Sequence, residues 1–563
     1  MNYGFIIDNR KCIGCHACTV ACKAEHDVPI GVNRTWVKYI EKGEYPHTRR
    51  LFSVMRCNHC ADAPCVEICP VQALFIREDG IVDFDNRRCI GCKACTQACP
   101  YDALYIDPNT HTAAKCNYCA HRVDIGLEPA CVNVCPEHAI ISGDMDDPAS
   151  EISQLLAREQ LTARKVEKGT RPKLFYIEGD TASLVPASSA PSSAYFWNSQ
   201  IAGVGHYAKY AEKRIAESDP AGMARQLSPE EQAGNGEVRW IGDDKSPAEK
   251  VLVPGGGGEP KMLRKAAEVL RESMASARRV YDAPGKGVMW GWEVSAYVCT
   301  KAIAAGTFLV SLFTMFFGDI SIFKMGEWLS LGIGISLLFL AITGGLLIKD
   351  LDKPQRFAYV LLRPQWRSWL VRGGYAVTLY GGFLALLGIS IFFDWPTGNF
   401  AAWGGVLFAI LTAVYTAFLF AQAKGRDFWQ SPALALHMFG HSVIAGAAMI
   451  AIVAPYLYHG EGWENAVRMG LYGGIAFNLV IIFVEILTPH PTADAKKTVQ
   501  MIVRGRFGVA FWWGSVLLGN LLPLALLWIG GNTLLPLAGA LALIGMYITE
   551  HIWVRAPQLI PLS

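Results

Sequence analysis

The sequence lacks the basic patches interleaved with aromatic residues that mark nucleic-acid-binding proteins, and its formal net charge is only +2. It also has no glycine-rich nucleotide fingerprint between a predicted strand and a predicted helix. The first residues, MNYGFIIDNRKC, show no positively charged leader followed by an apolar run, so we expect no secretory signal. We therefore expect no nucleic-acid partner and no catalytic residues for a small soluble substrate on this chain.

Cysteine is almost absent after residue 135, where Cys299 stands alone in an apolar stretch and is expected to be a small packing residue. The other sixteen cysteines form four groups of four: Cys12, Cys15, Cys18 and Cys22; Cys57, Cys60, Cys65 and Cys69; Cys89, Cys92, Cys95 and Cys99; Cys116, Cys119, Cys131 and Cys135. A C-x2-C-x2-C run lets one loop present three sulfurs to a cubane, while the fourth cysteine ligates the other cluster of a pair. The groups therefore predict four [4Fe–4S] clusters with all sixteen cysteines as ligands.

Two other uses of cysteine fit the sequence less well. Zinc knuckles use pairs of cysteines rather than runs of four, and a disulfide framework needs an oxidising compartment that nothing else here indicates. Proline follows Cys69, Cys99 and Cys135, as it often follows the remote ligand of a cluster, although lysine follows Cys22. Iron–sulfur clusters are the preferred interpretation.

Residues 1–180 are expected to form an α+β doubled ferredoxin-like domain. Short strands are predicted at 5–8, at 73–77 with 81–84, and at 103–106, between the cysteine loops. The spacing alone leaves open which groups exchange ligands.

The next stretch changes character. Residues 181–260 are rich in Pro, Gly and Ser and predict a flexible linker, either a tether between two domains or an arm over a partner subunit. Within the segment 261–288, apolar residues recur at helical spacing over the basic stretch 261–281. This pattern predicts an amphipathic helix, lying at the membrane interface or packed on the cluster domain.

Residues 289–563 predict an all-α eight-helix transmembrane bundle. Eight apolar stretches approach the roughly 20 residues that a hydrocarbon core requires. They cover 294–317, 327–348, 373–393, 401–422, 433–455, 467–487, 508–529 and 533–553. Tryptophans near the span ends indicate an aromatic belt: Trp290, Trp292, Trp328, Trp369, Trp403, Trp463 and Trp553.

Basic residues are unequally divided between the two sets of loops. The side that carries the cluster domain holds Lys349, Lys353, Arg356, Arg363, Arg367, Arg372, Lys424, Arg426, Lys496, Lys497, Arg504, Arg506 and Arg555. The opposite side offers Lys324 and Arg468. The positive-inside rule therefore predicts a multi-pass protein of the inner (cytoplasmic) membrane of a prokaryote, with the clusters facing the cytoplasm.

The four cysteine groups, with the longer gap between Cys119 and Cys131, resemble the four-cluster electron-transfer subunit of molybdenum oxidoreductases of the dimethyl sulfoxide reductase and polysulfide reductase type. The likeness covers residues 3–180 and implies that groups one and four, and groups two and three, exchange their last ligands. The implied sets are Cys12, Cys15, Cys18 with Cys135; Cys116, Cys119, Cys131 with Cys22; Cys57, Cys60, Cys65 with Cys99; and Cys89, Cys92, Cys95 with Cys69. It also implies that the outer pair faces a catalytic subunit and that the set with Cys69 lies nearest the membrane.

The membrane half is similar to the polysulfide-reductase membrane-subunit (NrfD-type) family over residues 290–555, in its eight spans, the stretch KAIAAGTF and the loop KDLDKPQRFAYVLLRPQWRSWLVRGGY. That family exchanges electrons with quinone near the cluster domain and is not known for haem. The two resemblances imply an electron-transfer subunit between a separate cytoplasmic catalytic subunit, expected to be molybdopterin-dependent, and the menaquinone or ubiquinone pool. The alternative is a quinone-coupled, proton-translocating module with a hydrogenase or heterodisulfide-reductase-like partner.

Ionisable residues inside the predicted spans are functional candidates, because burying a charge in a membrane is costly. Glu293, Tyr297 and Lys301 share one helical face in the cluster-side half of span one. We expect them to contact quinone, with a structural polar network or snorkelling side chains as alternatives. Arg356, in the loop after span two, is a further candidate at the quinone entrance.

Span five carries His437 and His441 one turn apart, and span six carries Glu485 near its cluster-side end. These three residues are candidates for a proton path, and satisfied helix–helix hydrogen bonding is the competing interpretation. Histidines on one helical face could not ligate opposite faces of one haem, so we expect no haem. Glu550 and His551 end span eight on the same side.

Overall fold

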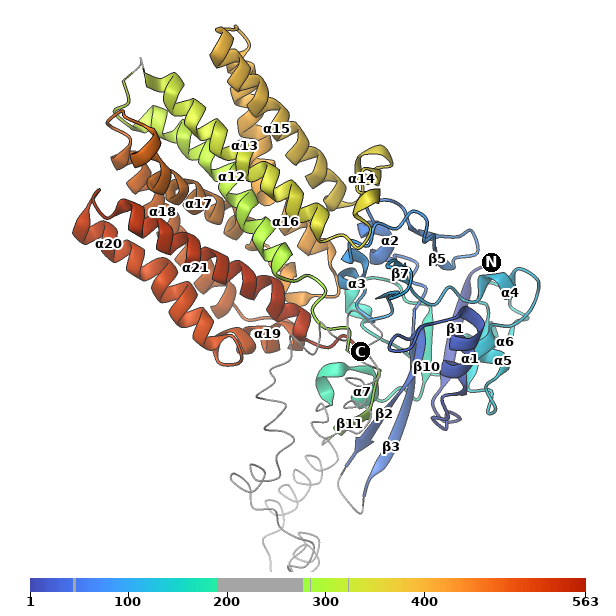
Figure 1. Ribbon diagram of the computed structural model, residues 1–563. Coiled ribbons are helices and arrows are strands. Elements are labelled where there is room, and N and C mark those ends of the chain that lie inside the picture. The colour runs from blue at the N-terminus through green and yellow to red at the C-terminus, as the bar shows by residue number, and fades with distance from the viewer. Residues whose placement is uncertain (44–46, 190–276, 284, 322–323) are drawn as a thin grey trace, which may run out of the picture.

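The computed structural model describes residues 1–43, 47–189, 277–283, 285–321 and 324–563. Within these ranges an α+β domain lies against one end of a long helical bundle (Figure 1), so both predicted fold classes are confirmed. Most of the predicted linker 181–260 and the first part of the predicted amphipathic helix, 261–276, lie outside the described residues.

Short strands build the α+β domain. They are β1 (Tyr3–Asp8), β2 (Thr35–Lys42), β3 (Arg49–Arg56), β4 (Leu74–Ile76), β5 (Val82–Phe84), β6 (Tyr105–Ile106), β7 (Ala113–Ala114), β8 (Ile140–Asp144), β9 (Leu161–Ala163), β10 (Leu174–Ile177) and β11 (Ala277–Tyr281). One sheet has the order β8-β1-β10-β9, with β1 parallel to β10 and antiparallel to β8, and a second has the order β11-β2-β3. The pairs β4–β5 and β6–β7 complete the domain. The predicted strands correspond to β1, β4, β5 and β6.

Short helices complete this domain, and α1 to α5 carry or follow its cysteines. They are α1 (Ala17–His26), α2 (Pro64–Ile68), α3 (Ala94–Ala98), α4 (Ala120–Val123), α5 (Ala130–Asn133), α6 (Glu151–Arg158), α7 (Thr181–Leu184) and the 3-10 turns η1 (Val166–Lys168) and η2 (Pro186–Ser188). In the first loop Gly14 and His16 have φ of 73° and 61°, and in the third Gly91 and Lys93 have φ of 71° and 61°. Left-handed backbone at a non-glycine residue is uncommon, so the repeated pattern shows that the two loops share one backbone path.

The predicted helix is wrong over residues 277–281, which form strand β11. This strand pairs antiparallel with β2, with Ala277 opposite Lys42. Arg278 Nε donates to Glu41 Oε2 at 2.8 Å, and Arg279 forms an ion pair of 2.9 Å with Asp282. The edge of β2 offers backbone donors and acceptors that must find partners, and this pairing outweighs the helical spacing.

The start of the predicted linker belongs to the cluster domain. Helix α7 begins after Asp180, whose carboxylate accepts the backbone N–H of Ala182 at 2.8 Å. Leu184 is buried, and α7 packs on β2 and β3. The Ser- and Pro-rich composition concealed this turn because a single capped turn carries little periodic signal.

In the described residues, eight helices are long and apolar enough to cross a membrane. They are α12 (Trp292–Phe317), α13 (Met325–Lys349), α15 (Trp369–Phe393), α16 (Gly398–Gln422), α17 (Leu434–Leu457), α18 (Glu464–Leu487), the pair η7 (Ala510–Leu521) with α20 (Leu522–Gly530), and α21 (Leu535–Arg555). Shorter pieces connect them: η5 (Pro354–Arg356), α14 (Tyr359–Leu362), η6 (Asp427–Gln430), α19 (Ala493–Val503) and η8 (Ala556–Leu559). All eight predicted spans are therefore confirmed.

Glycines allow two pairs of these helices to approach closely. Gly306 of α12 faces Gly446 of α17, and Gly519 of η7 faces Gly545 of α21. A Cβ added at any of the four positions would collide with the backbone of the facing helix. Such small-residue contacts bring membrane helices together by van der Waals packing.

The segment η7 is wound as a π-helix, a form that often marks functional sites.

The predicted aromatic belt is only partly right. Trp292 and Trp403 are exposed on the outside of the bundle, as a belt requires, at 48% and 74%. Trp290 and Trp553, in contrast, are buried at the end that meets the cluster domain, and Trp328 and Trp463 are buried as a stacked pair. The buried ones pack between helices because aromatic rings bury large areas, and the indole N–H groups of Trp290, Trp328 and Trp553 each donate to an acceptor.

The cluster domain contacts the loops that carry most of the predicted positive flank. After α13, the N–H of Lys353 donates to the carbonyl of Ile90 at 3.2 Å. After α16, the N–H of Gly425 donates to the carbonyl of Gln97 at 3.2 Å. After α18, Asp494 lies 3.8 Å from the Lys165 ammonium. These loops therefore lie on the side of the cluster domain, as predicted, and contact it directly.

Candidate metal centres and buried polar cluster

Three cavities in the cluster domain are each lined by four cysteines from two different groups. The first is lined by Cys12, Cys15, Cys18 and Cys135, the second by Cys57, Cys60, Cys65 and Cys99, and the third by Cys69, Cys89, Cys92 and Cys95. Each cavity thus combines three cysteines of one group with the last cysteine of another. This grouping matches three of the four ligand sets that the family resemblance implies.

The fourth set is held together by α1 and α5. Cys22, at the end of the first group, interacts electrostatically with Cys116, Cys119 and Cys131 of the fourth. Helix α1 carries Cys22 and packs on α5, which carries Cys131. The chain therefore brings together the members of the remaining set.

The chemistry of these thiols suits iron ligation. All seventeen cysteines are free of disulfides. Burial raises the pKa of Cys18 and of Cys57 to about 11, so a buried free thiol would stay protonated at neutral pH. Coordination to iron is what would hold them as thiolates. Backbone N–H groups of Ala73 and Ala139 already point at the sulfurs of Cys69 and Cys135, both at 3.2 Å.

The cavity with Cys69, Cys89, Cys92 and Cys95 lies against the membrane bundle. Trp290, just before α12, donates its indole N–H to the carbonyl of Cys92 at 3.2 Å. Arg356 donates from one nitrogen to the carbonyls of Asn86 and Cys89, at 2.8 and 2.9 Å. Arg356 is thus placed on the loop of the metal centre, where it holds the two parts of the chain together.

Lys93, next to the same cavity, is buried and lies between two acids of the α13–α14 loop. Its ammonium is 3.5 Å from a carboxylate oxygen of Asp350 and 3.5 Å from one of Asp352. Ser368, just before α15, donates to the carbonyl of Ile68 at 2.7 Å. These contacts hold the centre lined by Cys69, Cys89, Cys92 and Cys95, called the inner centre below, against the bundle.

Stacked aromatic rings lead from this centre into the membrane half. Trp290 stacks on Phe420 and on Trp429, with ring centroids 5.7 and 5.6 Å apart. Trp429 donates to the carbonyl of Trp553 at 2.8 Å, and Trp553 donates to Glu485 at 3.1 Å. All three tryptophans are at most 4% exposed. Glu485 and the centre lined by Cys69, Cys89, Cys92 and Cys95 are thus joined by continuous, buried packing.

The C-terminal segment holds Trp290 in place. Gln558 accepts the backbone N–H groups of Met289 and Trp290, each at 3.0 Å, and donates to the carbonyl of Trp290 at 2.9 Å. Gln97 of the third cysteine group donates to the same Gln558 oxygen at 3.1 Å. Arg426 donates to Gln97 at 2.9 Å, and burial lowers the pKa of Arg426 to about 10. No sequence motif identified these residues, because their role depends on contacts between distant segments.

Two histidine–carboxylate pairs lie at the centre of the bundle. His437 Nδ1 lies 2.7 Å from Glu485 of α18, and His441 Nδ1 lies 2.6 Å from Glu550 of α21. All four side chains are at most 4% exposed. The two imidazole rings lie 4.3 Å apart, and neither Nε2 atom has a hydrogen-bond partner within the described residues. The predicted trio His437, His441 and Glu485 is brought together, and Glu550 completes it.

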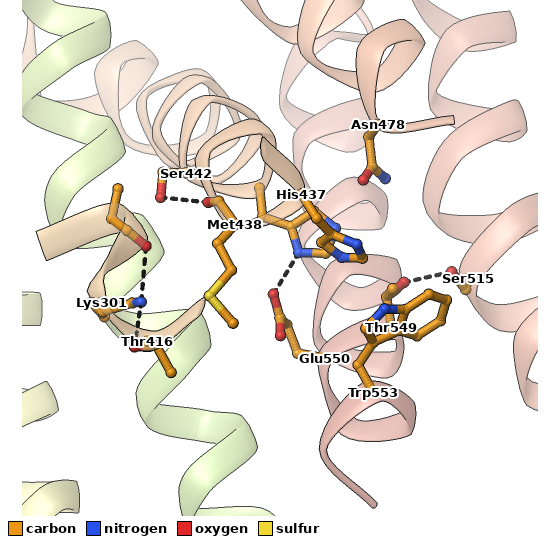
Figure 2. A network of polar contacts seen from close by, with 12 residues as sticks. Lys301, Thr416, His437, Met438, Ser442, Asn478, Ser515, Thr549, Glu550 and Trp553 are labelled. Carbon is orange, nitrogen blue, oxygen red and sulfur yellow. Dashed lines mark hydrogen bonds and ion pairs between the residues drawn. The ribbon is translucent and has the colours of Figure 1, made fainter. Parts of the chain in front are cut away.

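Lys301 lies close to this cluster, across Met438 in Figure 2. Its ammonium donates to the carbonyl of Ala413 at 2.9 Å and to the hydroxyl of Thr416 at 2.7 Å, and it lies 4.8 Å from the centre of the Tyr415 ring. Its charge interacts with Glu550. The first-span and fifth-span candidates, treated as separate sets from the sequence, therefore belong to one polar region.

Tyr297 and Glu293 lie nearer the cluster domain on the same helix. Tyr297 is 4% exposed, and Glu293 is half-buried, with one carboxylate oxygen that lacks a partner among the described residues. The predicted quinone candidates Glu293, Tyr297 and Lys301 thus follow α12 inward from the inner centre.

The polar region continues beyond the histidines. Asn478, two turns before Glu485 on α18, donates to Asn520 at 3.0 Å, and Asn520 donates to the carbonyl of Ser515 at 2.8 Å. Ser515 and Thr549 share a hydrogen bond. Asn520 and Ser515 both lie on the π-helical segment η7. Polar side chains thus extend from the cluster side into the depth of the bundle.

Comparisons with known proteins agree with both halves. Two models described as a 4Fe-4S dicluster domain match residues 11–74 and 48–145, and a model described as polysulphide reductase, NrfD, matches residues 283–560. Fold and matches together define an iron–sulfur electron-transfer protein joined to an NrfD-type membrane domain.

Curated relatives cover the first third of the chain. A subunit of the tetrathionate reductase of Salmonella typhimurium is 48% identical over 189 residues, which are 33% of this chain and 75% of the relative. A polypeptide of the polysulfide reductase of Wolinella succinogenes is 44% identical over 180 residues, 31% of this chain and 93% of the relative. Protein NrfC of Escherichia coli is 43% identical over 180 residues, 31% of this chain and 81% of the relative. The chain belongs to this family of reductase iron–sulfur subunits, and it carries the NrfD domain on the same polypeptide.

Proposed function

We propose that the chain passes electrons through four [4Fe–4S] clusters, ligated by the sixteen cysteines in the sets described above, between a separate catalytic subunit and quinone in the membrane. Electron transfer by an iron–sulfur subunit is the role shared with its relatives. Quinone would bind in the cluster-side half of the bundle, next to Glu293, Tyr297 and Lys301. The clusters supply one-electron transfer; the residues of this chain hold them, exclude water and carry protons.

One observation carries the quinone proposal. The inner cysteine set is in contact with the bundle through Trp290 and Arg356, and the buried ionisable residues begin directly beneath it. Quinone reduction needs electrons and protons at the same place. Lys301 and the His–Glu pairs could supply the protons. The packed rings from Trp290 to Trp553 fill the space between these residues and the centre with Cys69, Cys89, Cys92 and Cys95.

The opposite end of the domain suits docking of a catalytic subunit. Cys15 is exposed, and Ile13, in the same loop, is 56% exposed. The tetrathionate and polysulfide reductase relatives are named as single components of those reductases, which implies a further polypeptide. We propose a molybdopterin-dependent partner that docks over this loop.

Quinol oxidation tests the membrane half. Purified full-length protein with oxidised clusters is mixed with menaquinol or ubiquinol under anaerobic conditions, and cluster reduction is followed by visible absorbance. We expect Lys301→Met and Tyr297→Phe to slow reduction at least tenfold. Lys324→Met, on the opposite side of the bundle, is the matched control. Unchanged rates in both variants would place quinone elsewhere.

Purification from the native membrane in mild detergent tests the partner. We expect about sixteen irons per chain, four per cubane, together with molybdenum or tungsten and a large second subunit. Nickel in the co-purified subunit would instead indicate a hydrogenase-type partner and contradict the molybdopterin proposal.

We further propose that the cluster domain faces the cytoplasm, on the strength of the basic loops on its side. The C-terminus lies beside this domain (Figure 1). A fluorescent protein that folds only in the cytoplasm should therefore fluoresce when fused after residue 563. Fluorescence only from a fusion in the loop after α17 would reverse the orientation.

A second function is favoured by the depth of the polar region. The His–Glu pairs and the Asn478–Asn520 contact could conduct protons away from the quinone site, which would make the chain proton-translocating. In proteoliposomes, Glu485→Gln should then abolish proton transfer while it spares electron transfer. If the variant lost both activities or neither, the proton-path role of Glu485 would be wrong.

A further inference from the structure

Side-chain nitrogen donors to cysteine sulfur are concentrated on one of the four cysteine sets. Arg56 Nη1 lies 3.1 Å from the sulfur of Cys131, and His26 Nε2 lies 3.1 Å from the sulfur of Cys119. Both sulfurs belong to the set with Cys22 and Cys116. Within the described residues, no other cysteine sulfur accepts a hydrogen bond from an Arg, Lys or His side chain.

Arg56 is an unusual cation. Its side chain is 0% exposed, its guanidinium lies 4.5 Å from the centre of the Phe5 ring, and its Nε and Nη2 atoms have no hydrogen-bond partner in the described part of the chain. No carboxylate forms an ion pair with it in that part. A buried, unpaired charge is very costly unless an opposite charge lies nearby. Once they hold iron as thiolates, the sulfurs of Cys131, Cys116 and Cys18 would be the negative groups near it.

His26 makes the second contact. An iron-bound thiolate has no proton, so the short contact to Cys119 requires the proton to be on His26 Nε2. Glu25, the neighbouring acid, lies within 2.7 Å of His121 and 3.3 Å of Arg122 and so does not add an uncompensated negative charge. The set therefore receives two N–H···S contacts and one buried positive charge.

The inner set differs in this respect. Beside Cys69, Cys89, Cys92 and Cys95, the cations Lys93 and Arg356 are matched by the acids Asp350 and Asp352. The local charge therefore sums to zero, and Arg356 donates to backbone carbonyls rather than to sulfur. Any electrostatic effect on the inner centre is much smaller.

We infer that Arg56 and His26 are positioning residues that raise the reduction potential of the cluster held by Cys22, Cys116, Cys119 and Cys131. This inference rests on the proposed ligand sets. Reduction adds one negative charge to a cluster, and hydrogen bonds to sulfur together with a nearby cation stabilise that charge. Arg56 acts mainly on this cluster and more weakly on the neighbour held in part by Cys18.

The test is a redox titration of the full-length protein followed by electron paramagnetic resonance, which resolves the centres without enzyme turnover. We expect Arg56→Gln to change the reduced-to-oxidised ratio of one centre at least tenfold at a fixed potential. This corresponds to a midpoint potential lowered by about 59 mV for a one-electron couple. His26→Leu should lower the same midpoint by a smaller amount, because it removes a neutral donor. The double variant should shift it furthest.

Controls separate this inference from the ligand assignment. Arg171→Gln removes an exposed arginine that pairs with Asp62 and should leave all midpoints unchanged. Iron content and the number of titrating centres in the unmodified protein test the ligand sets by themselves. If Arg56→Gln fails to assemble, Arg56→Lys is the second variant. It keeps the positive charge but not the several N–H donors of the guanidinium, so we expect an intermediate shift of the midpoint potential. Unchanged midpoints at full iron content, or shifts of different centres in the Arg56 and His26 variants, would overturn the inference.

Discussion

The two halves of the chain both bury charged side chains, and they compensate those charges differently. In the cluster domain the buried Arg56 lies next to cysteine sulfur. In the bundle His437 and His441 each face a carboxylate on another helix. At these positions the cluster domain relies on cysteine sulfur for charge balance, whereas the bundle uses its own carboxylates. Removal of iron and removal of a single carboxylate should therefore damage different halves.

The largest effect should come from loss of the metal centres. Several strands of the cluster domain have two or three residues, and its cysteines form much of its core. We expect iron removal by a chelator to unfold this domain while the membrane helices persist. Limited proteolysis should then cut within residues 1–189 and leave a fragment that contains the bundle. A protease-resistant domain without iron would contradict the first half of the comparison.

A carboxylate in the bundle should have the next largest effect. Glu485→Leu leaves His437 and Trp553 without their shared acceptor, and breaking a buried pair in this way costs about 3–5 kcal/mol. We expect a clearly lower Tm in detergent and unchanged iron content. The matched variants are Glu485→Gln, which keeps an acceptor for Trp553, and the double change His437→Leu with Glu485→Leu. Both should be less destabilised than Glu485→Leu.

Lys38 is a buried lysine of the cluster domain that, unlike Arg56, makes no contact with sulfur. Burial lowers the pKa of Lys38 to about 7, below its value in an unfolded chain. Between pH 7 and about 10 the unfolded chain binds the additional proton, so stability should rise with pH by at most about 1.4 kcal/mol per unit. Lys38→Met should remove this slope. The measurement is the pH dependence of Tm for the two proteins, and equal slopes would contradict the assignment.

The smallest effect should come from a surface pair. Lys42 lies 2.9 Å from Asp180, and both side chains are partly exposed. Lys42→Ala should change stability by only about 0.5 kcal/mol, because water screens exposed ion pairs. A denaturation midpoint close to that of the unmodified protein is expected. A loss as large as that of Glu485→Leu would mean that surface charge, rather than buried charge, stabilises this part of the sheet.

Several parts of the site could be predicted from single stretches of sequence. The cysteine spacing indicated cluster ligands, and the apolar runs indicated all eight spans, because both signals repeat within one short segment. Residues 277–281 were misassigned because an isolated edge strand has no signal stronger than helical spacing. Trp290, Trp553 and Gln558 were missed as a joint between the halves, since tryptophan near a span end is equally typical of a membrane surface.

The chemistry that the chain can perform follows from single stretches of its sequence: thiolates in runs of four for iron, and ionisable residues in apolar spans for protons. Which of these groups meet depends on how distant segments pack. Packing brings Glu550 to His441 and Arg56 to Cys131, and it brings Cys22 to Cys116 as the family resemblance implies. The physical reason is that spacing acts along one helix or loop, whereas charge compensation acts over a few ångströms between segments that packing alone brings together.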